Sequence, residues 1–313
     1  MSAFLTAILT TGFVVAAIRM MTPILLAALG DLYAERTGVM NIGLESMMLI
    51  GAFVSFVAAW HTGNVYLAVL ITIVCGVVLG LFHAFMTVSL RCNQVVTAVA
   101  ENIFALGVTS VLNRFIFGAG SNLPECPVLP SLNIPGLSSL PVAGEIFFQH
   151  NILVYFSILA VILTSVIIFK TTFGLRLRAV GEHPQAADTL GIRVYVTRYI
   201  CIVISGMMAA LGGACLTIGG LGRYMDNMTA GRGFIALAAV IFGRYNPGGV
   251  LLAALLFGIT DAFQLRMQAS GIGLPHQLFL MLPYLITLIV LVVFMGPSTA
   301  PRSMGKPYVR EER

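Results

Sequence analysis

Charged side chains are scarce in this chain of 313 residues, where they occupy 9% of all positions. Hydrophobic residues occupy 58%, and the mean hydropathy is +0.98. In a water-soluble domain about a quarter of the residues are Asp, Glu, Lys or Arg. The composition therefore excludes a water-soluble domain and indicates a polytopic membrane protein. The formal net charge of +5 is too small to indicate a nucleic-acid partner.

The residue patterns of catalytic and metal sites are also missing. The five cysteines form no Cys-x-x-Cys pair, and the five histidines are isolated from one another, so we expect neither a disulfide framework nor a metal site. The phosphate-binding pattern Gly-x-x-x-x-Gly-Lys-Ser/Thr is absent, since the one Gly-Lys pair, Gly305-Lys306, is followed by Pro307. We therefore expect no enzyme activity and no cofactor. Any ATP hydrolysis that drives this chain must reside on another polypeptide.

Long apolar runs separated by short polar breaks fill most of the sequence. We expect about nine membrane-spanning helices, within a range of roughly eight to ten. The first charged residue is Arg19, so the N-terminus lacks the basic region of a signal peptide and the first run is expected to remain as a span. Arg19 and Pro23 interrupt this first run. The runs lie at about 4–30, 42–60, 65–89, 95–117, 151–169, 199–219, 232–244, 248–266 and 276–296.

The basic residues are distributed unevenly between the two sides of these spans. If the polar segment 170–198 is cytoplasmic, alternation places twelve Lys and Arg residues inside, four outside or near that face, and Arg19 within a span. This bias follows the positive-inside rule. We therefore expect an external N-terminus, an external loop at 118–150 and a cytoplasmic C-terminal tail at 297–313.

Two segments that begin with glycine resemble each other. One starts at Gly43 and the other at Gly231, and each continues with a charge, an apolar run, a polar break, a second apolar run and a final Ala-Phe. The expected orientation makes them antiparallel. We therefore expect an all-α membrane protein, a single transmembrane domain over 1–313, with inverted repeat copies at about 1–117 and 199–296 and the substrate path between them. The alternative is that two Gly-rich membrane hairpins look alike by composition.

The polar segment 170–198 contains the signature of a short helix. Pro184 is suited to a first helical position, and Gly191 is suited to ending a helix after Leu190. The small residues Ala186 and Ala187 provide a surface that a partner protein can approach closely. We expect a cytoplasmic helix that docks on a separate ATPase, and the alternative is an ordinary amphipathic loop helix.

A few polar side chains fall inside or beside the apolar runs. Such residues are costly in a membrane and usually face a cavity or a partner. Our candidates for the transport path are Asn41, Glu45, Glu101, Asn102 and Arg232. Glu45 and Arg232 open the two repeat copies, so we expect them near one another. The alternative for each is that it caps a helix or is paired structurally, and for Glu101 both interpretations stay open.

Three segments resemble the membrane permease subunits of bacterial ATP-binding-cassette (ABC) importers of simple sugars, nucleosides and branched-chain amino acids. Thr22–Phe53 (TPILLAALGDLYAERTGVMNIGLESMMLIGAF) is similar to the nucleoside-type pattern ERxGVxNIGLEGMMLxGAF. Gly174–Ile192 (GLRLRAVGEHPQAADTLGI) resembles the family's cytoplasmic coupling loop. Ala230–Gly258 (AGRGFIALAAVIFGRYNPGGVLLAALLFG) is the third match. Two positions depart from the pattern, since Gln185 replaces a common Glu and Ser46 replaces a usual Gly.

The resemblance implies the fold of the ribose and vitamin B12-type permeases and a place in the bacterial inner (plasma) membrane. It implies a translocation path for a small polar solute, a nucleoside or a simple sugar. The implied partners are an ABC ATPase subunit, a second homologous permease chain or a second copy, an external substrate-binding protein and the lipid bilayer, without nucleic acid. The residues implied to couple to the ATPase are Gly181, Glu182, Pro184, Gln185, Ala186, Ala187 and Gly191.

A self-sufficient secondary transporter or channel is the competing hypothesis. It also suits an inverted repeat and membrane carboxylates such as Glu45, Glu101 and Asp261. The coupling-type loop and the family motifs favour the ABC permease. A membrane-embedded enzyme is a third class, and the sequence shows no assembled catalytic set for it. The sequence does not fix the cargo within the nucleosides and simple sugars.

Overall fold

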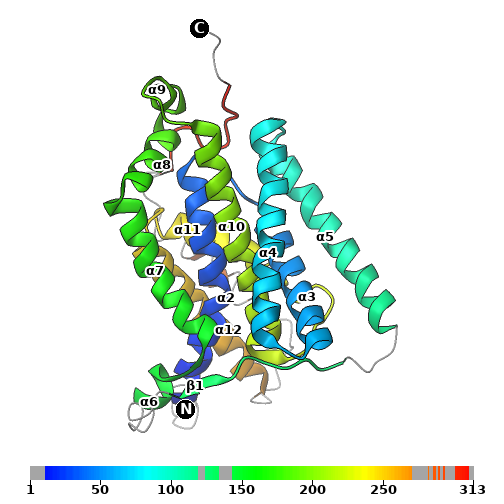
Figure 1. Ribbon diagram of the computed structural model, residues 1–313. Helices are drawn as coiled ribbons and strands as arrows, with labels where there is room; N and C mark the ends of the chain where they lie inside the picture. The colour runs from blue at the N-terminus through cyan, green and yellow to red at the C-terminus, as the bar shows by residue number, and fades with distance from the viewer. Residues whose placement is uncertain are drawn as a thin grey trace.

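The computed structural model describes residues 11–118, 124–133, 143–269 and 300–309, with a few positions between 281 and 292. In these residues the chain forms a bundle of long helices (Figure 1). Helices α2 and α10 run antiparallel through its centre, and α3, α4 and α12 pack against them. The helices in chain order are α2 (Thr11–Arg36), α3 (Leu44–Thr62), α4 (Val65–Ala84), α5 (Gln94–Phe117), α6 (Ala143–Phe147), α7 (Ile152–Lys170), α8 (Thr172–Glu182), α9 (Pro184–Thr189), α10 (Val194–Leu216), α11 (Arg232–Phe242) and α12 (Pro247–Ala269). Two π-helical turns, η1 (Phe85–Ser89) and η2 (Thr217–Leu221), extend α4 and α10.

Seven helices in the described part of the chain are long and apolar enough to cross a membrane. They are α2, α3, α4 with η1, α5, α7, α10 with η2, and α12. The seventh predicted run forms α11, which has 11 residues and is short, as the sequence predicted. The ninth predicted run, 276–296, falls largely outside the described residues. The prediction of a helical, polytopic membrane protein is confirmed, whereas the count of nine spans stays a prediction.

The first span extends further than the sequence predicted. Helix α2 continues through Pro23 to Arg36. The Thr22 hydroxyl, beside this proline, donates to the Ile18 carbonyl one turn earlier, at 2.9 Å. The apolar run stops before Asp31, although Asp31 is fully buried in the last turns of the helix. A boundary drawn from hydropathy alone therefore falls short of the real end.

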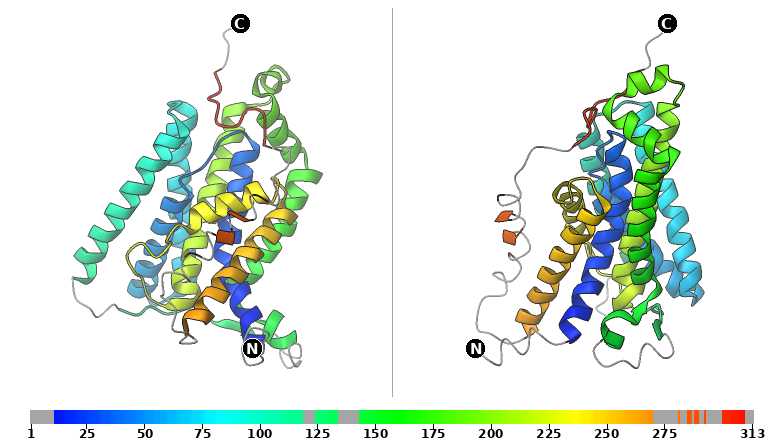
Figure 2. Two further views of the ribbon diagram at one scale, coloured as in Figure 1. Left: turned by 180° about the vertical axis from the view of Figure 1, so that it is seen from behind. Right: turned by 90° about the vertical axis from the view of Figure 1, so that its left-hand side faces the viewer.

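Small residues allow the central helices to approach closely. Gly206 of α10 lies against Gly80 of α4, and a Cβ atom on Gly206 would come within 2.9 Å of the Gly80 Cα atom. Helix pairs in membranes use such positions because lipid offers no hydrophobic driving force for association. Figure 2 shows that α5 leans away from the rest of the bundle at one end.

The two ends of the bundle carry different structures. At one end, called here the α9 end, α8 and α9 fold back over the bundle together with residues 300–309 (Figures 1 and 2). At the other, called the β end, β1 (Ser131–Asn133) pairs antiparallel with β2 (Gln149–Asn151). The expectation of a purely α-helical chain misses this strand pair. Strands of three residues in a proline-rich loop are too short to show a periodic pattern.

Candidate functional site

Glu45 lies in the first turn of α3 and caps a different helix. Its carboxylate accepts hydrogen bonds from the Thr229 hydroxyl at 2.5 Å and from the amides of Gly231 and Gly233 at 2.9 and 2.7 Å. Gly231 has a φ of 85°, a left-handed conformation that suits glycine and turns the chain into α11. A carboxylate at a helix N-terminus satisfies free amides and favours the helix dipole. Glu45 therefore ties α3 to the start of α11.

Arg232, the first residue of α11, lies between the two glycine amides that Glu45 binds. Its guanidinium donates to the carbonyls of Met228 and Thr229, each at 3.3 Å. It also lies 3.4 Å from the Asp261 carboxylate of α12. Sequence reasoning expected Glu45 and Arg232 near one another, and the structure places them side by side at one helix start. The Arg232 side chain keeps 24% of its surface exposed, on the side of a cavity.

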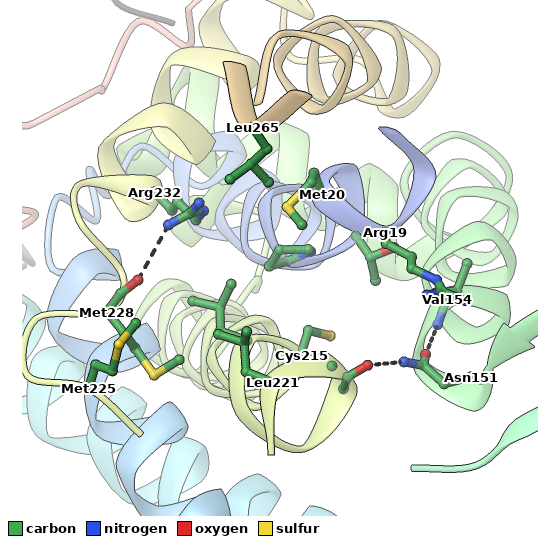
Figure 3. A pocket seen from close by; sticks show the side chains of 15 residues that line it. Arg19, Met20, Asn151, Val154, Cys215, Leu221, Met225, Met228, Arg232 and Leu265 are labelled. Atoms are coloured by element: carbon green, nitrogen blue, oxygen red, sulfur yellow. Dashed lines mark hydrogen bonds between the residues drawn. The ribbon is translucent and has the colours of Figure 1, made fainter. Parts of the chain in front are cut away.

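The cavity beside Arg232 has a volume of about 520 Å³, which lies within the range of small-molecule sites. In Figure 3, Arg232 and Arg19 lie on opposite sides of it, with Met20, Leu221 and Leu265 between them. The cavity is thus mainly apolar with cationic groups at its edges. Of the five predicted path residues, Arg232 is the one that lines it.

Asn151, the last residue of β2, lines the cavity. Its amide nitrogen donates to the Gly219 carbonyl at 2.7 Å, and its amide oxygen accepts from the Val154 amide at 3.1 Å. The two partner residues, Gly219 and Val154, also line the cavity. The side chain therefore links β2, the start of α7 and η2 around the cavity.

Asn41 and Asn102 lie where the chain enters α3. The Asn102 oxygen of α5 accepts from the Ser46 amide at 2.9 Å, and its nitrogen donates to the Ile42 carbonyl at 3.3 Å. The Asn41 nitrogen donates to the Ser205 hydroxyl of α10 at 2.9 Å. These two amides fix the entrance to α3 against α5 and α10, and they do not line the cavity beside Arg232.

Glu101 pairs with a histidine that sequence reasoning did not single out. Its carboxylate lies 2.8 Å from Nδ1 of His83, which is fully buried on α4. Gly43 allows this approach, because a Cβ there would lie 2.6 Å from a Glu101 oxygen. The contact agrees with the interpretation of Glu101 as a paired membrane carboxylate. The residues are 18 positions apart on different helices, so no local sequence signal joins them.

Two buried carboxylates on α2 were not among the residues that the sequence singled out. Asp31 and Glu35 are 0% and 2% exposed, one helical turn apart, and both oxygens of Asp31 lack a hydrogen-bond partner within the described residues. Arg36 donates to the Tyr245 carbonyl at 2.9 and 2.6 Å, which holds the α11–α12 turn nearby. Burial, followed by the charges of Glu35 and Asp31, raises the pKa of the Tyr245 phenol. The sequence signal for this pair is the spacing of four residues between Asp31 and Glu35, directly after an apolar run.

The predicted short helix is present in segment 170–198 as α9. Pro184 occupies its first turn, and Gly191, with a φ of 82°, follows its end. Gln185 and Ala186 are exposed, and Leu190 is 81% exposed. Ala187 differs from expectation, since it is 3% exposed and packs against the chain itself. The helix α8 before it was not predicted.

Seven long apolar helices among the described residues, buried polar groups between them and a cavity inside the bundle are the features of a polytopic membrane protein. Its sequence matches the family model described as "Branched-chain amino acid transport system / permease component" over residues 13–291, and the chain belongs to this family. It is therefore the permease of an ABC importer in the plasma membrane and not itself an enzyme.

Three relatives show the extent of the similarity. The chain is 40% identical to the guanosine ABC transporter permease protein NupQ of Bacillus subtilis and 38% identical to the nucleoside ABC transporter permease protein NupC of Lactococcus lactis. Each alignment covers 93% of this chain and 94% of the relative. It is 38% identical to the putative glucose ABC transporter permease protein TsgC13 of Haloferax volcanii, over 84% of this chain and 80% of the relative. No solved structure matches the chain.

Proposed function

We propose that this chain carries nucleosides across the plasma membrane as the permease subunit of an ABC importer. The observation that supports the cargo is the similarity, over nearly the whole chain, to permeases named for guanosine and for nucleosides. The 520 Å³ cavity, with apolar walls and cationic edges, is large enough for a solute of that size. A simple sugar is the second candidate, because a relative of similar identity is named as a putative glucose permease.

The proposed path runs between the two repeat copies, past the start of α11. Arg232 contacts the solute directly, since it lines the cavity. Glu45 holds Arg232 in place through the amides on either side of it. Asn41, Glu101 and Asn102 flank the path at the entrance to α3. The antiparallel course of α2 and α10 in Figure 1 supports the inverted repeat that this path requires.

The proposed orientation places the α9 end in the cytoplasm and the N-terminus, with loop 118–150, outside. The support is the distribution of basic residues. In this orientation α9 docks on the ATPase subunit, and the external binding protein delivers solute at the β end. Nine spans and a partner permease, either a homologue or a second copy of this chain, complete the proposed transporter.

The cargo is tested by competition for uptake. Cells that carry the complete transporter take up labelled guanosine while unlabelled guanosine, cytidine, ribose or glucose is added in excess. We expect guanosine and cytidine to compete and ribose and glucose not to compete. Competition by glucose alone would favour the sugar hypothesis and contradict nucleoside transport. The Arg232→Met variant should lower uptake. Arg266→Met is the control, because it makes the same change at another arginine in the same half of the chain, and it should not lower uptake.

A further inference from the structure

Residues 300–309, called here the tail segment, are fastened to the α9 end of the bundle (Figures 1 and 2). The amide and the hydroxyl of Ser303 both donate to the Gly181 carbonyl at the end of α8, at 3.0 and 2.6 Å. The Gly305 amide donates to the Gly38 carbonyl at 3.0 Å, just after α2. The tail segment therefore links the end of α2 to the α8–α9 turn.

The tail segment also forms the support behind α9. Tyr308 is 4% exposed and packs in one cluster with Ala187, Val180 and Val194. Its ring meets that of Tyr195 edge to face, at 5.4 Å between centroids. Ala187 lies on the inward side of α9 and packs with Tyr308 of the tail segment. The position of α9 therefore depends on the tail segment.

Beside this contact, a groove of about 350 Å³ lies between the start of α9 and residues 302–307 of the tail segment. Glu182 and Gln185 line one side of it, and Arg302 and Lys306 line the other. Arg302 and Lys306 are exposed. With Glu182 they are the charged side chains that line the groove, two cations and one carboxylate. A groove with this excess of positive charge is complementary to an acidic segment.

We propose that the tail segment and α9 form one docking surface, and that the groove between them receives an acidic segment of the ATPase subunit. This inference rests on the proposed coupling of α9 to that subunit. Helix α9 has six residues, whereas each partner of a stable complex contributes about 20–30 residues to the interface. The tail segment widens the surface with two cations, while Leu190, at the tip of α9, supplies an apolar contact.

The ATPase subunit is first isolated from the wild-type complex. The test then measures how tightly it binds to each purified permease variant. We expect Arg302→Glu and Lys306→Glu each to weaken binding at least tenfold and Arg302→Lys to bind as wild type. The weakening should reflect lost attraction, so wild-type binding should fall with added salt. Lys170→Glu makes the same charge change at the end of α7, outside the groove, and should bind normally. Equal weakening by Lys170→Glu would overturn the groove as the site.

A second variant separates this inference from the proposed function. Leu190→Asp changes the tip of α9 and leaves the tail segment intact. If Leu190→Asp loses binding and both tail variants bind normally, the composite surface is overturned and the coupling role of α9 stands. If all three variants bind normally, both proposals fail. Loss in the tail variants with normal binding by Leu190→Asp would also contradict a shared surface. Insertion and thermal unfolding of each variant should match the wild type.

Discussion

Single polar residues fix the junction at the start of α11. Glu45 accepts three hydrogen bonds from the turn and the helix start that hold Arg232 beside the cavity. The sequence pointed to Glu45 and Arg232 because charges in apolar segments are costly. It did not show that Glu45 binds the backbone on either side of Arg232, because a contact 186 residues apart depends on how the helices pack.

We expect Glu45→Ala to lower the free energy of unfolding by about 3 kcal/mol, since it leaves donors at a buried helix start without an acceptor. Glu45→Gln keeps one acceptor oxygen and should cost roughly half as much. Thermal unfolding of the purified protein in detergent measures both. Glu145→Gln, at an exposed carboxylate of α6, is the control and should unfold as wild type. An unchanged midpoint for Glu45→Ala would refute the capping role.

At the scale of elements, the predictable parts are those with strong local signals. Pro184 and Gly191 predicted the limits of α9, and hydropathy predicted the long spans and the shortness of α11. Helix α8 was missed because its five apolar residues are interrupted by a glycine and two arginines, so it contains no continuous apolar run. For the tail segment the sequence predicted only that it belongs to a cytoplasmic tail at 297–313. Its hydrogen bonds to Gly181 and Gly38 all end on backbone carbonyls, which no side-chain pattern reveals.

The two alanines of α9 should respond differently to the same substitution. Ala186 is exposed, so Ala186→Glu should leave the fold intact and weaken binding of the ATPase subunit. Ala187 is 3% exposed, so Ala187→Glu places an unpaired charge against Val180 and Tyr308 and should destabilise the α9 region itself.

Limited proteolysis of the α9 region distinguishes the two variants. We expect faster cleavage within 182–193 for Ala187→Glu and wild-type cleavage for Ala186→Glu. Equal protection of both variants would mean that Ala187 does not support α9 as described.

At the scale of the whole molecule, central helices α2 and α10 join the two ends. Helix α2 leads from the cavity residue Arg19 to the turn that the tail segment binds. Helix α10 begins beside α9 and ends in η2, at the wall of the same cavity. A movement of the α9 end therefore has a direct structural route to the cavity. Such a route is what an ABC permease needs, because its motor is a separate chain.

The most direct test of ATP-driven transport is guanosine uptake into proteoliposomes that contain the reconstituted complex. With the external binding protein present, we predict accumulation that requires ATP on the ATPase side and is abolished by Ala186→Glu. Without the ATPase subunit, the permease should transport nothing. Equilibration of guanosine by this chain alone, at the same rate with and without ATP, would contradict the account and establish a self-sufficient transporter or channel.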